Sequence, residues 1–310
     1  MEDNILQLIQ DLDSKISIFT NNFQKYKQYF FKDEEKNLIK FNTVDLFLLC
    51  YCNNIEILSF SPAENKLLLK NKNGTILATD NRYFNISEVI ANDAYSVPQL
   101  YEFNDFVVFD IGMNRGYASL RFAEFNNCSM VYGFEIDDIT YNKAIYHKKL
   151  NSQLADKLKL YNFGISDKNS SETLYFVKGA DTLSTIEADY MDIQYPVKSS
   201  KDKVETKIVE VRRASEVIEN IIKVDNIKSK IVLKIDTEGS EYKIIDDLIQ
   251  TDTIKNIDLI MGEAHQFGDN EIDLKLKNAG FKLIKRVDLK NVYTFAYVKE
   301  EYFDKWILNE

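Results

Sequence analysis

The stretch F-V-V-F-D-I-G-M-N-R-G-Y, residues 106–117, joins an apolar run to two glycines that stand four positions apart. The apolar run is typical of a buried strand, and it ends at Asp110. Gly112 and Gly116 then permit a tight turn into a helix. In such a turn the backbone can approach a ligand closely, and the helix N-terminus offers N–H groups. The stretch therefore predicts a strand, a ligand-binding loop and a helix.

The same alternation of short apolar runs and amphipathic stretches continues from about residue 104 to the C-terminus. The predicted strands are residues 106–110, 130–136, 159–163, 231–236, 257–263, 281–287 and 292–298. The predicted helices are residues 116–125, 139–154, 241–250 and 270–278. This alternation predicts an α/β fold with a doubly wound, mostly parallel, seven-stranded sheet. The last two strands lie too close together for a helical crossover, so we expect an antiparallel C-terminal hairpin.

The N-terminal third of the chain has a different character, because Gly74 is the only glycine before residue 110. We expect residues 1–100 to form an appendage of one helix and a β-hairpin, and residues 101–310 to form the main domain. Asn73-Gly74 predicts a type I′ turn between strands at 66–69 and 75–78.

Apolar side chains in the first 31 residues recur at steps of three and four, which is typical of a helical seam. They are Ile5, Leu8, Leu12, Ile16, Phe19, Phe23, Tyr26 and Phe30. The helix either packs on its own domain or pairs with a second subunit in a homodimer. The pattern leaves both interpretations open.

Composition excludes several classes of function. The net charge of -10 argues against a nucleic-acid-binding surface, which needs a basic stripe. The acidic N-terminus is unlike a signal peptide, and the longest apolar run is far shorter than the ~20 residues of a membrane span. Three cysteines with no paired spacing indicate free thiols in a reducing compartment, so we expect a cytoplasmic protein. Two histidines argue against a Cys/His zinc site, and we predict no metal site.

Polar side chains follow the predicted strands at their carboxyl ends, where ligands bind in open α/β sheets. Asp110 would repel a phosphate but suits a ligand with a cationic amino group. Glu135 ends the second strand, where a carboxylate can accept both hydroxyls of a ribose. Asn162 and Gly164 follow the third strand, and Asp236 follows the fourth. Together these residues predict a site for a nucleoside that carries an amino-acid tail.

Five segments, FDIGMNRGY, VYGFEI, NFGISD, LKIDTEGSE and GEAH, resemble the FkbM family of S-adenosylmethionine (SAM)-dependent methyltransferases over roughly residues 104–298. The resemblance implies the seven-stranded class I methyltransferase fold and SAM as the cofactor. It also implies contacts with the methionine end of SAM from Asp110, Gly112, Asn114, Gly116 and Tyr117. By the same resemblance Glu135 would bind the ribose, and Asn162 and Gly164 would flank the adenine.

The chain departs from the family pattern at three places. Met113 stands where a small residue is usual, and Ile136 stands where proline is usual. The run Arg213-Ala-Ser-Glu216 replaces a T-L-D-like turn before the fourth strand. The last departure leaves the details of acceptor binding near that turn open.

Methyl transfer to a hydroxyl needs a base for its proton, and a carboxylate or a histidine beside the methyl group can serve. We expect Asp236 and Glu238 to face the active cleft and Glu241 to be structural, in the first turn of a helix. His265 is a second candidate base with Glu263 as its orienting partner. The alternative for His265 is a loop histidine whose hydrogen bonds are satisfied within the protein.

The preferred function is O-methylation of a hydroxyl on a sugar or other small acceptor in bacterial surface-polysaccharide biosynthesis, a substrate class implied by the resemblance alone. The polar residues 178–203 could close over that acceptor, with Ser184, Tyr190 and Tyr195 in contact, or form a flexible insert. One alternative is an oxidoreductase that uses NAD or a nucleotide sugar, which Asp110 and the glycine spacing disfavour. Another is a non-catalytic SAM-binding assembly scaffold, which Asp236 and Glu238 disfavour.

Overall fold

The chain divides into two compact units, Met1–Asn92 and Asp93–Glu310. The computed structural model describes residues 50, 52–61, 66–79, 84–177, 184–194, 203–265, 271–288 and 292–307. The predicted helical seam at residues 5–30 lies outside this range. The division after Asn92 comes somewhat earlier in the chain than our expected boundary at residue 100.

The N-terminal unit contains a three-stranded antiparallel sheet, with α3 (Phe84–Ile86) and η1 (Ser87–Ala91) after it. Its strands are β1 (Glu56–Ser61), β2 (Lys66–Lys70) and β3 (Ile76–Thr79). The hairpin predicted between residues 66–69 and 75–78 is confirmed, since β2 and β3 pair antiparallel.

The turn of this hairpin is not the predicted type I′. Gly74 has a positive φ of 88°, but Asn73 does not share it, and a type I′ turn needs both. The side-chain oxygen of Asn71 accepts hydrogen bonds from the backbone of Asn73 (2.9 Å) and of Thr75 (3.0 Å). These two bonds spread the bend over a longer loop, with glycine alone in the left-handed region.

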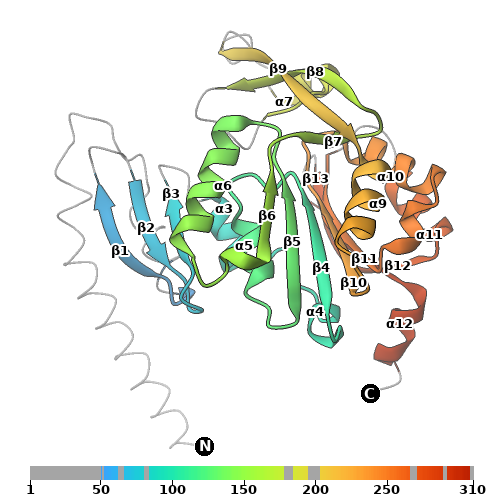
Figure 1. The fold of residues 1–310 in the computed structure, drawn as a ribbon, viewed down its shortest axis with the longest axis horizontal. Coiled ribbons are helices and arrows are strands. Elements are labelled where there is room, and N and C mark those ends of the chain that lie inside the picture. Colours follow the sequence, from blue (N-terminus) through green and yellow to red (C-terminus); the bar gives the residue numbers. More distant parts are fainter. Residues whose placement is uncertain are drawn as a thin grey trace, which may run out of the picture. The chain divides into compact units, whose positions relative to one another are not determined.

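The main unit is built on a seven-stranded sheet with the order β12-β13-β11-β10-β4-β5-β6 (Figure 1). The strands are β4 (Phe106–Ile111), β5 (Cys128–Phe134), β6 (Leu158–Tyr161), β10 (Lys230–Ile235), β11 (Leu259–His265), β12 (Phe281–Asp288) and β13 (Val292–Lys299). Only β13 runs against its neighbours, β11 and β12. The mostly parallel sheet with an antiparallel C-terminal hairpin is the architecture of class I methyltransferases, as predicted.

Helices alternate with these strands. The longer ones are α5 (Tyr117–Ala123), α6 (Asp138–Leu150), α9 (Ala214–Val224), α10 (Glu241–Gln250), α11 (Glu271–Asn278) and α12 (Glu300–Ile307). The short ones are α4 (Gln99–Glu102), η2 (Ala155–Lys157), α7 (Ala188–Gln194) and η3 (Thr253–Asn256). No helix among the described residues has the length and apolar character needed to cross a membrane. The four predicted helices correspond to α5, α6, α10 and α11, and of the longer helices α9 and α12 were not predicted.

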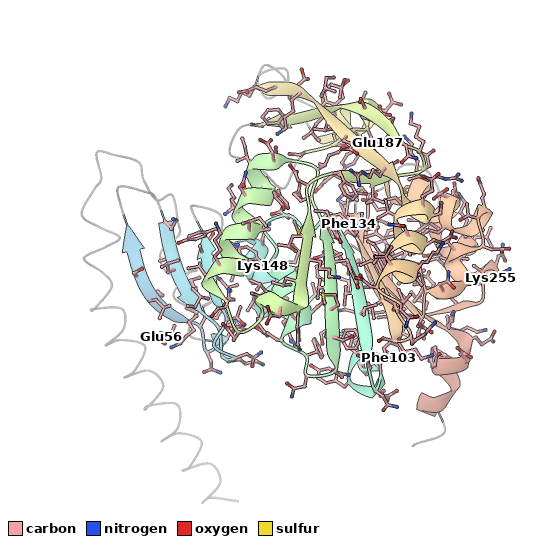
Figure 2. All side chains as sticks on the ribbon, in the orientation of Figure 1. Glu56, Phe103, Phe134, Lys148, Glu187 and Lys255 are labelled. Carbon is pink, nitrogen blue, oxygen red and sulfur yellow. The ribbon has the colours of Figure 1, made fainter. Side chains whose placement is uncertain are left out.

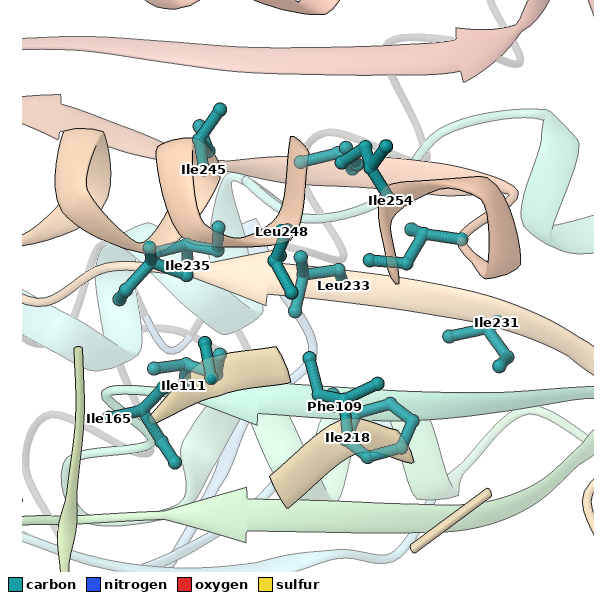
Figure 3. Close-up of a cluster of buried hydrophobic side chains, with 14 of the residues drawn as sticks. Phe109, Ile111, Ile165, Ile218, Ile231, Leu233, Ile235, Ile245, Leu248 and Ile254 are labelled. Atoms are coloured by element: carbon teal, nitrogen blue, oxygen red, sulfur yellow. The ribbon is translucent and has the colours of Figure 1, made fainter. Parts of the chain in front are cut away.

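One face of the sheet carries the main hydrophobic core, which α9, α10 and α11 cover. Leu233 and Ile235 of β10 face Ile245 and Leu248 of α10, and all four are fully buried (Figure 3). The spacing of the two α10 residues places them on one side of the helix. Burial of this face fixes which strand residues point the other way, toward the site described below.

A second, small sheet was not predicted. Its strands β7 (Gly164–Ser166), β8 (Ser170–Val177) and β9 (Val204–Arg213) have the order β7-β9-β8. Most β9 side chains are exposed or half-buried, so the segment lacks the apolar run on which our strand prediction relied. The polar stretch after β8 is joined to it by a bridge between Tyr175 and Thr185, and α7 follows.

The burial contrast between two isoleucines yields a stability prediction. Ile260 of β11 is fully buried, whereas Ile208 of β9 is 71% exposed. We expect Ile260→Ala to lower the free energy of unfolding by about 2–5 kcal/mol, because it removes core contacts and leaves a cavity. Ile208→Ala should change it by no more than about 0.5 kcal/mol. Urea denaturation of both variants checks this, and equal midpoints would contradict the core assignment.

Candidate functional site

The loop after β4 has a backbone shape that its glycines make possible. Gly112, Asn114 and Gly116 have positive φ angles of 74°, 53° and 81°. A Cβ atom on Gly112 would lie 1.7 Å from the backbone oxygen of Asp236, so only glycine fits there. The amides of Gly112 and Met113 donate to the Phe134 oxygen at 3.1 and 2.9 Å. The loop therefore lies directly against the ends of β5 and β10.

Asp110 is buried completely at the end of β4. Its Oδ2 accepts a hydrogen bond from Ser119 of α5 at 2.6 Å, and its Oδ1 lies 3.1 Å from the Lys234 ammonium. The carboxylate thus anchors the first helix and a neighbouring strand. Its contact with the methionine end of SAM stays a prediction.

Lys234 is the residue that our sequence reasoning missed. Its side chain is buried in β10, and its ammonium donates to the Gly112 oxygen at 2.7 Å. Burial opposes the charge, but the nearby carboxylates Asp110 and Asp236 outweigh it and raise the pKa of Lys234. A signal was present, because a lysine inside the apolar strand K-I-V-L-K-I must find an anionic partner.

Glu135 follows β5 and is nearly buried. Its oxygens accept hydrogen bonds from the backbone amides of Asn114 (2.9 Å) and Asp137 (2.8 Å). Burial raises the pKa of Glu135 to about 7, although these two amides act in the opposite direction. Each carboxylate oxygen has a further lone-pair site. The group can therefore accept the two hydroxyls of a ribose when it is ionised.

The other predicted cofactor residues divide into two groups. Asn162 lies at the same edge and donates from its side-chain amide to the Glu135 carbonyl at 2.9 Å. Gly164 and Tyr117 are buried in packing: a Cβ on Gly164 would lie 2.5 Å from Ile136, and the Tyr117 ring stacks edge-on against His147 at 4.9 Å. The structure thus brings the other six predicted residues to one edge of the sheet, and Gly164 and Tyr117 pack behind them.

His147 of α6 faces inward, although two lysines follow it in the sequence. It is buried, and its Nδ1 donates to the carbonyl of Arg115 in the cofactor loop at 2.8 Å. The two lysines that follow it, Lys148 and Lys149, suggested an exposed face. They occupy other directions around α6, so His147 points inward and braces the loop.

A turn of acidic residues follows β10. Asp236, Glu238 and Glu263 have 25%, 21% and 15% of their side chains exposed. Glu238 and Gly239 adopt positive φ angles of 56° and 116°, which turn the chain sharply into α10. Asp236 accepts a hydrogen bond from the hydroxyl of Tyr95 at 3.0 Å. The acids predicted to be catalytic therefore lie together where β10 and β11 end.

Glu241 does more than cap a helix. It is fully buried and accepts hydrogen bonds from the backbone of Thr237 (2.7 Å) and Gly239. Its Oε1 also lies 3.1 Å from Nδ1 of His265, whereas Glu263 is 3.8 Å from Nε2. The orienting partner of His265 is thus Glu241, whereas we had predicted Glu263. Glu263 lies on the same strand as the histidine, and Glu241 reaches its other side from α10.

His265 is buried among acids that favour its charged form. Burial alone would lower the pKa of His265, but Glu241, Glu238 and Asp236 raise it well above 6.5. The pKa of Glu241 is lowered in turn, because His265 and the backbone amides outweigh its burial. An imidazolium has no lone pair with which to accept a proton. In this state the carboxylates of Asp236, Glu238 and Glu263 can act as a base.

Ligand atoms of Asp236, Glu263 and His265 all lie within 4.8 Å of one another. Among the described residues these three are the side chains close enough together to bind one metal ion, although we predicted no metal site. The same spacing suits a hydroxyl group that gives its proton to a carboxylate.

Part of the polar stretch 178–203 packs against the acidic turn. The Thr185 hydroxyl donates to the Glu238 carbonyl at 2.6 Å. Glu187, labelled near the small sheet in Figure 2, accepts from the Ser240 hydroxyl at 2.7 Å and pairs with Lys243. Tyr190 is buried with its ring 5.4 Å from that of His265. Ser184 is half-buried, and Tyr195 lies outside the described residues.

The family model of the methyltransferase FkbM domain matches residues 110–283, more than half of the chain. The chain belongs to the FkbM methyltransferase family. Its cofactor is accordingly SAM, and the protein is a SAM-dependent methyltransferase. The match begins at Asp110 and includes the acidic turn and His265. It therefore covers both the glycine loop after β4 and the acidic residues after β10 and β11.

Solved structures with a similar course of the chain include other methyltransferases. FkbM from Methylobacillus flagellatus KT is 14% identical with a TM-score of 0.40, covering 63% of this chain and 44% of that one. Streptococcus pneumoniae Sp1610 in complex with SAM is 11% identical with a TM-score of 0.37, covering 65% and 70%. M. capricolum TrmK in complex with S-adenosyl-homocysteine (SAH) is 10% identical with a TM-score of 0.36, covering 66% and 69%. Comparison with curated proteins finds no match.

The charge of His265 can be measured directly. With two histidines in the chain, ¹⁵N NMR resolves both rings, and a His147→Asn variant assigns them. We expect both nitrogens of His265 to carry protons at pH 7.5, because Glu241 and Glu238 raise its pKa. Glu241→Gln should lower that pKa.

The same raised pKa has a consequence for stability. The ion pairs of His265 contribute fully below its unfolded value near 6.5, and this contribution is lost as the pH rises through the folded value. The unfolding free energy should therefore fall with pH above 6.5 less steeply in Glu241→Gln than in the wild type. A neutral His265 ring at pH 7.5 would contradict the charge assignment.

Proposed function

We propose that this enzyme transfers the methyl group of SAM to a hydroxyl on a sugar or glycan-precursor acceptor, in bacterial surface-polysaccharide biosynthesis. The observation that carries the proposal is the convergence of Asp236, Glu263 and His265 within 4.8 Å at the strand ends, next to the glycine loop. This arrangement offers a base to a hydroxyl where the ends of β10 and β11 meet.

The residues of the loop fit the cofactor. Gly112 lets the loop pack against the Asp236 backbone because it has no side chain, and Glu135 holds a carboxylate at the tip of β5. We propose that Glu135 binds the ribose hydroxyls and that Asn114 and Gly116 shape the loop around the methionine end. Asp110 acts through Lys234 and Ser119, and Asn162 lies beside the adenine.

Bound SAM supplies a methyl group on a sulfonium, from which a hydroxyl oxygen can take it in line. Asp236 or Glu263 accepts the hydroxyl proton as the new C–O bond forms. Tyr95 orients Asp236, and Glu241 orients His265. The His265 imidazolium keeps its proton and offsets the charge of the surrounding acids. Most of the acceleration comes from holding the acceptor oxygen and the methyl group in line.

The charges on the acceptor side favour a neutral acceptor. Asp236, Glu238 and Glu263 lie together there with part of each side chain exposed, and such a surface repels phosphate groups. The proposal therefore excludes nucleic acid as an acceptor. Tyr190 and Ser184 lie on the segment that packs on the acidic turn, where an acceptor sugar would make contact.

One of the two alternative functions remains a separate proposal. A scaffold that binds SAM without turnover would assemble through the N-terminal seam, and deletion of residues 1–31 would test whether that seam forms a homodimer. An oxidoreductase that uses NAD does not agree with the family to which the chain belongs.

Glu135 yields a prediction about cofactor affinity. Glu135→Ala should weaken SAM binding by roughly 1–3 kcal/mol, since the ribose hydroxyls lose their acceptor. In the wild type the ionised form accepts these hydroxyls, and its pKa is about 7, so SAM affinity should rise with pH through 7. Below pH 7 binding should release a proton.

Isothermal titration with SAM, SAH and NAD in buffers of different ionisation enthalpy measures both effects. Glu205→Ala removes an exposed acid on β9 and should leave affinity unchanged. Wild-type affinity for SAM in Glu135→Ala would contradict the assignment of Glu135 to the ribose hydroxyls. Binding of NAD in place of SAM would overturn the proposed function.

The base makes a prediction about rate. Asp236→Asn and Glu263→Gln should both retain SAM binding. The variant that lacks the general base should lose about 10²–10⁴ in methyl-transfer rate, the usual effect of removing such a base. SAH formation on neutral mono- and oligosaccharides, nucleotide sugars and tRNA measures the rate. Glu210→Gln, on the exposed side of β9, is the matched control.

The acceptor panel separates the alternatives. Turnover on neutral sugars with none on tRNA agrees with the proposal, and turnover on tRNA would contradict it. SAM binding without turnover on any acceptor would favour the scaffold. A fully active Asp236→Asn/Glu263→Gln double variant would show that neither acid is the base.

A further inference from the structure

The ammonium of Lys234 lies between the two halves of the site. One of its protons goes to the Gly112 carbonyl at 2.7 Å, within the cofactor loop. It also lies 3.1 Å from Asp110 and 3.7 Å from Asp236, on the acceptor side. The Tyr95 ring is 5.3 Å away, within the range of a cation–π contact. One buried cation therefore contacts the cofactor loop and the proposed base at once.

We propose that Lys234 is a positioning residue: its ammonium holds the cofactor loop and Asp236 in a fixed relation, so that SAM binding and the base depend on one charge. The inference rests on the proposed roles of Glu135 and Asp236. Lys234 itself acts on the reaction only through these neighbours.

The backbone explains why a cation is needed between the cofactor loop and the acidic turn. Gly112 approaches the Asp236 carbonyl so closely that no Cβ would fit, and the Asp236 amide donates to Ile111 at 3.1 Å. The loop after β4 and the turn after β10 are thus in direct backbone contact. Buried between them, the Asp110 carboxylate would be destabilising without a cation, and Lys234 supplies that cation.

On the acceptor side one hydrogen bond and one ion pair act on the same oxygen of Asp236. The Tyr95 hydroxyl donates to Oδ2 at 3.0 Å, and the Lys234 ammonium lies 3.7 Å from the same atom. Tyr95 is buried and held in turn beneath the ammonium. Loss of the lysine would leave Asp236 with Tyr95 alone to set its direction.

The charge of Lys234 also reaches Glu135. Burial and Asp137 raise the pKa of Glu135, while Lys234 and the amides of Asp137 and Asn114 lower it. Lys207 forms an ion pair with Asp137, the acid next to Glu135 in this group. On the other side Asp110, Asp236 and Glu263 face Lys234. Removal of the lysine charge should therefore raise the pH at which Glu135 ionises and SAM binding strengthens.

The test compares two lysines of the same strand. Lys234→Met removes the buried charge, and Lys230→Met removes a half-exposed one at the opposite end of β10, where it pairs with Asp258. SAM dissociation constants are measured by titration calorimetry from pH 6 to 9. We expect Lys234→Met to weaken SAM roughly 10–100-fold at pH 7, the effect of one lost charged hydrogen bond. The pH at which affinity rises should move upward, and Lys230→Met should match the wild type.

A loss of folding would not explain an upward shift of the pH at which SAM affinity rises. The double variant Asp110→Asn/Lys234→Met removes both buried charges together, so no lone ion is left in the core. If Lys234→Met does not fold, the same weakening of SAM binding is expected in the double variant, whose loop has lost the Lys234 hydrogen bond to Gly112. Wild-type affinity and pH dependence in the folded variant would overturn the role of Lys234. A wild-type protein whose SAM affinity does not vary with pH would instead overturn the role of Glu135, which separates the two proposals.

Discussion

The ion pair between Lys234 of β10 and Asp110 of β4 is the interaction on which the site depends. The two strands are neighbours in the middle of the sheet, and these two residues are in register. Neither side chain reaches water, so each charge is stable only because the other is present. The pair lies at the carboxyl end of the sheet, where β4 is followed by the cofactor loop and β10 by the acidic turn. A class I sheet thus carries a polar centre between its two ligand-binding loops.

The hydrophobic core on the opposite face makes this polar centre possible. Leu233 and Ile235 pack under α10, and strand alternation then directs Lys234 and Asp236 to the other face. The same alternation on β11 places Glu263 and His265 on one side. Burial of apolar residues on one face therefore determines which charged groups meet on the other.

The residues of the site follow from local sequence, but several of the contacts between them do not. The strand ending at Asp110, the glycine turn and the acid after the second strand were all predictable, because each depends on residues within a short segment. The pairing of His265 with Glu241 and the inward face of His147 depend on contacts between distant residues. The hairpin turn differs for a local reason, because the Asn71 side chain accepts hydrogen bonds from the turn backbone. The small sheet escaped prediction because β9 is too exposed to show an apolar pattern. Lys234 was overlooked because lysine is rarely buried.

Two cations flank the acids of the acceptor half, and this arrangement has a physical consequence. Asp110, Lys234, Asp236, Glu263, His265 and Glu241 follow one another from the cofactor loop to the start of α10. Three acids as close as Asp236, Glu263 and Glu238 would repel one another strongly in a site with little water. Lys234 on one side and the His265 imidazolium on the other offset this repulsion. The cations let the acids stay close to a sulfonium and an acceptor hydroxyl, and so the protein itself supplies the positive charge that such a cluster of acids requires.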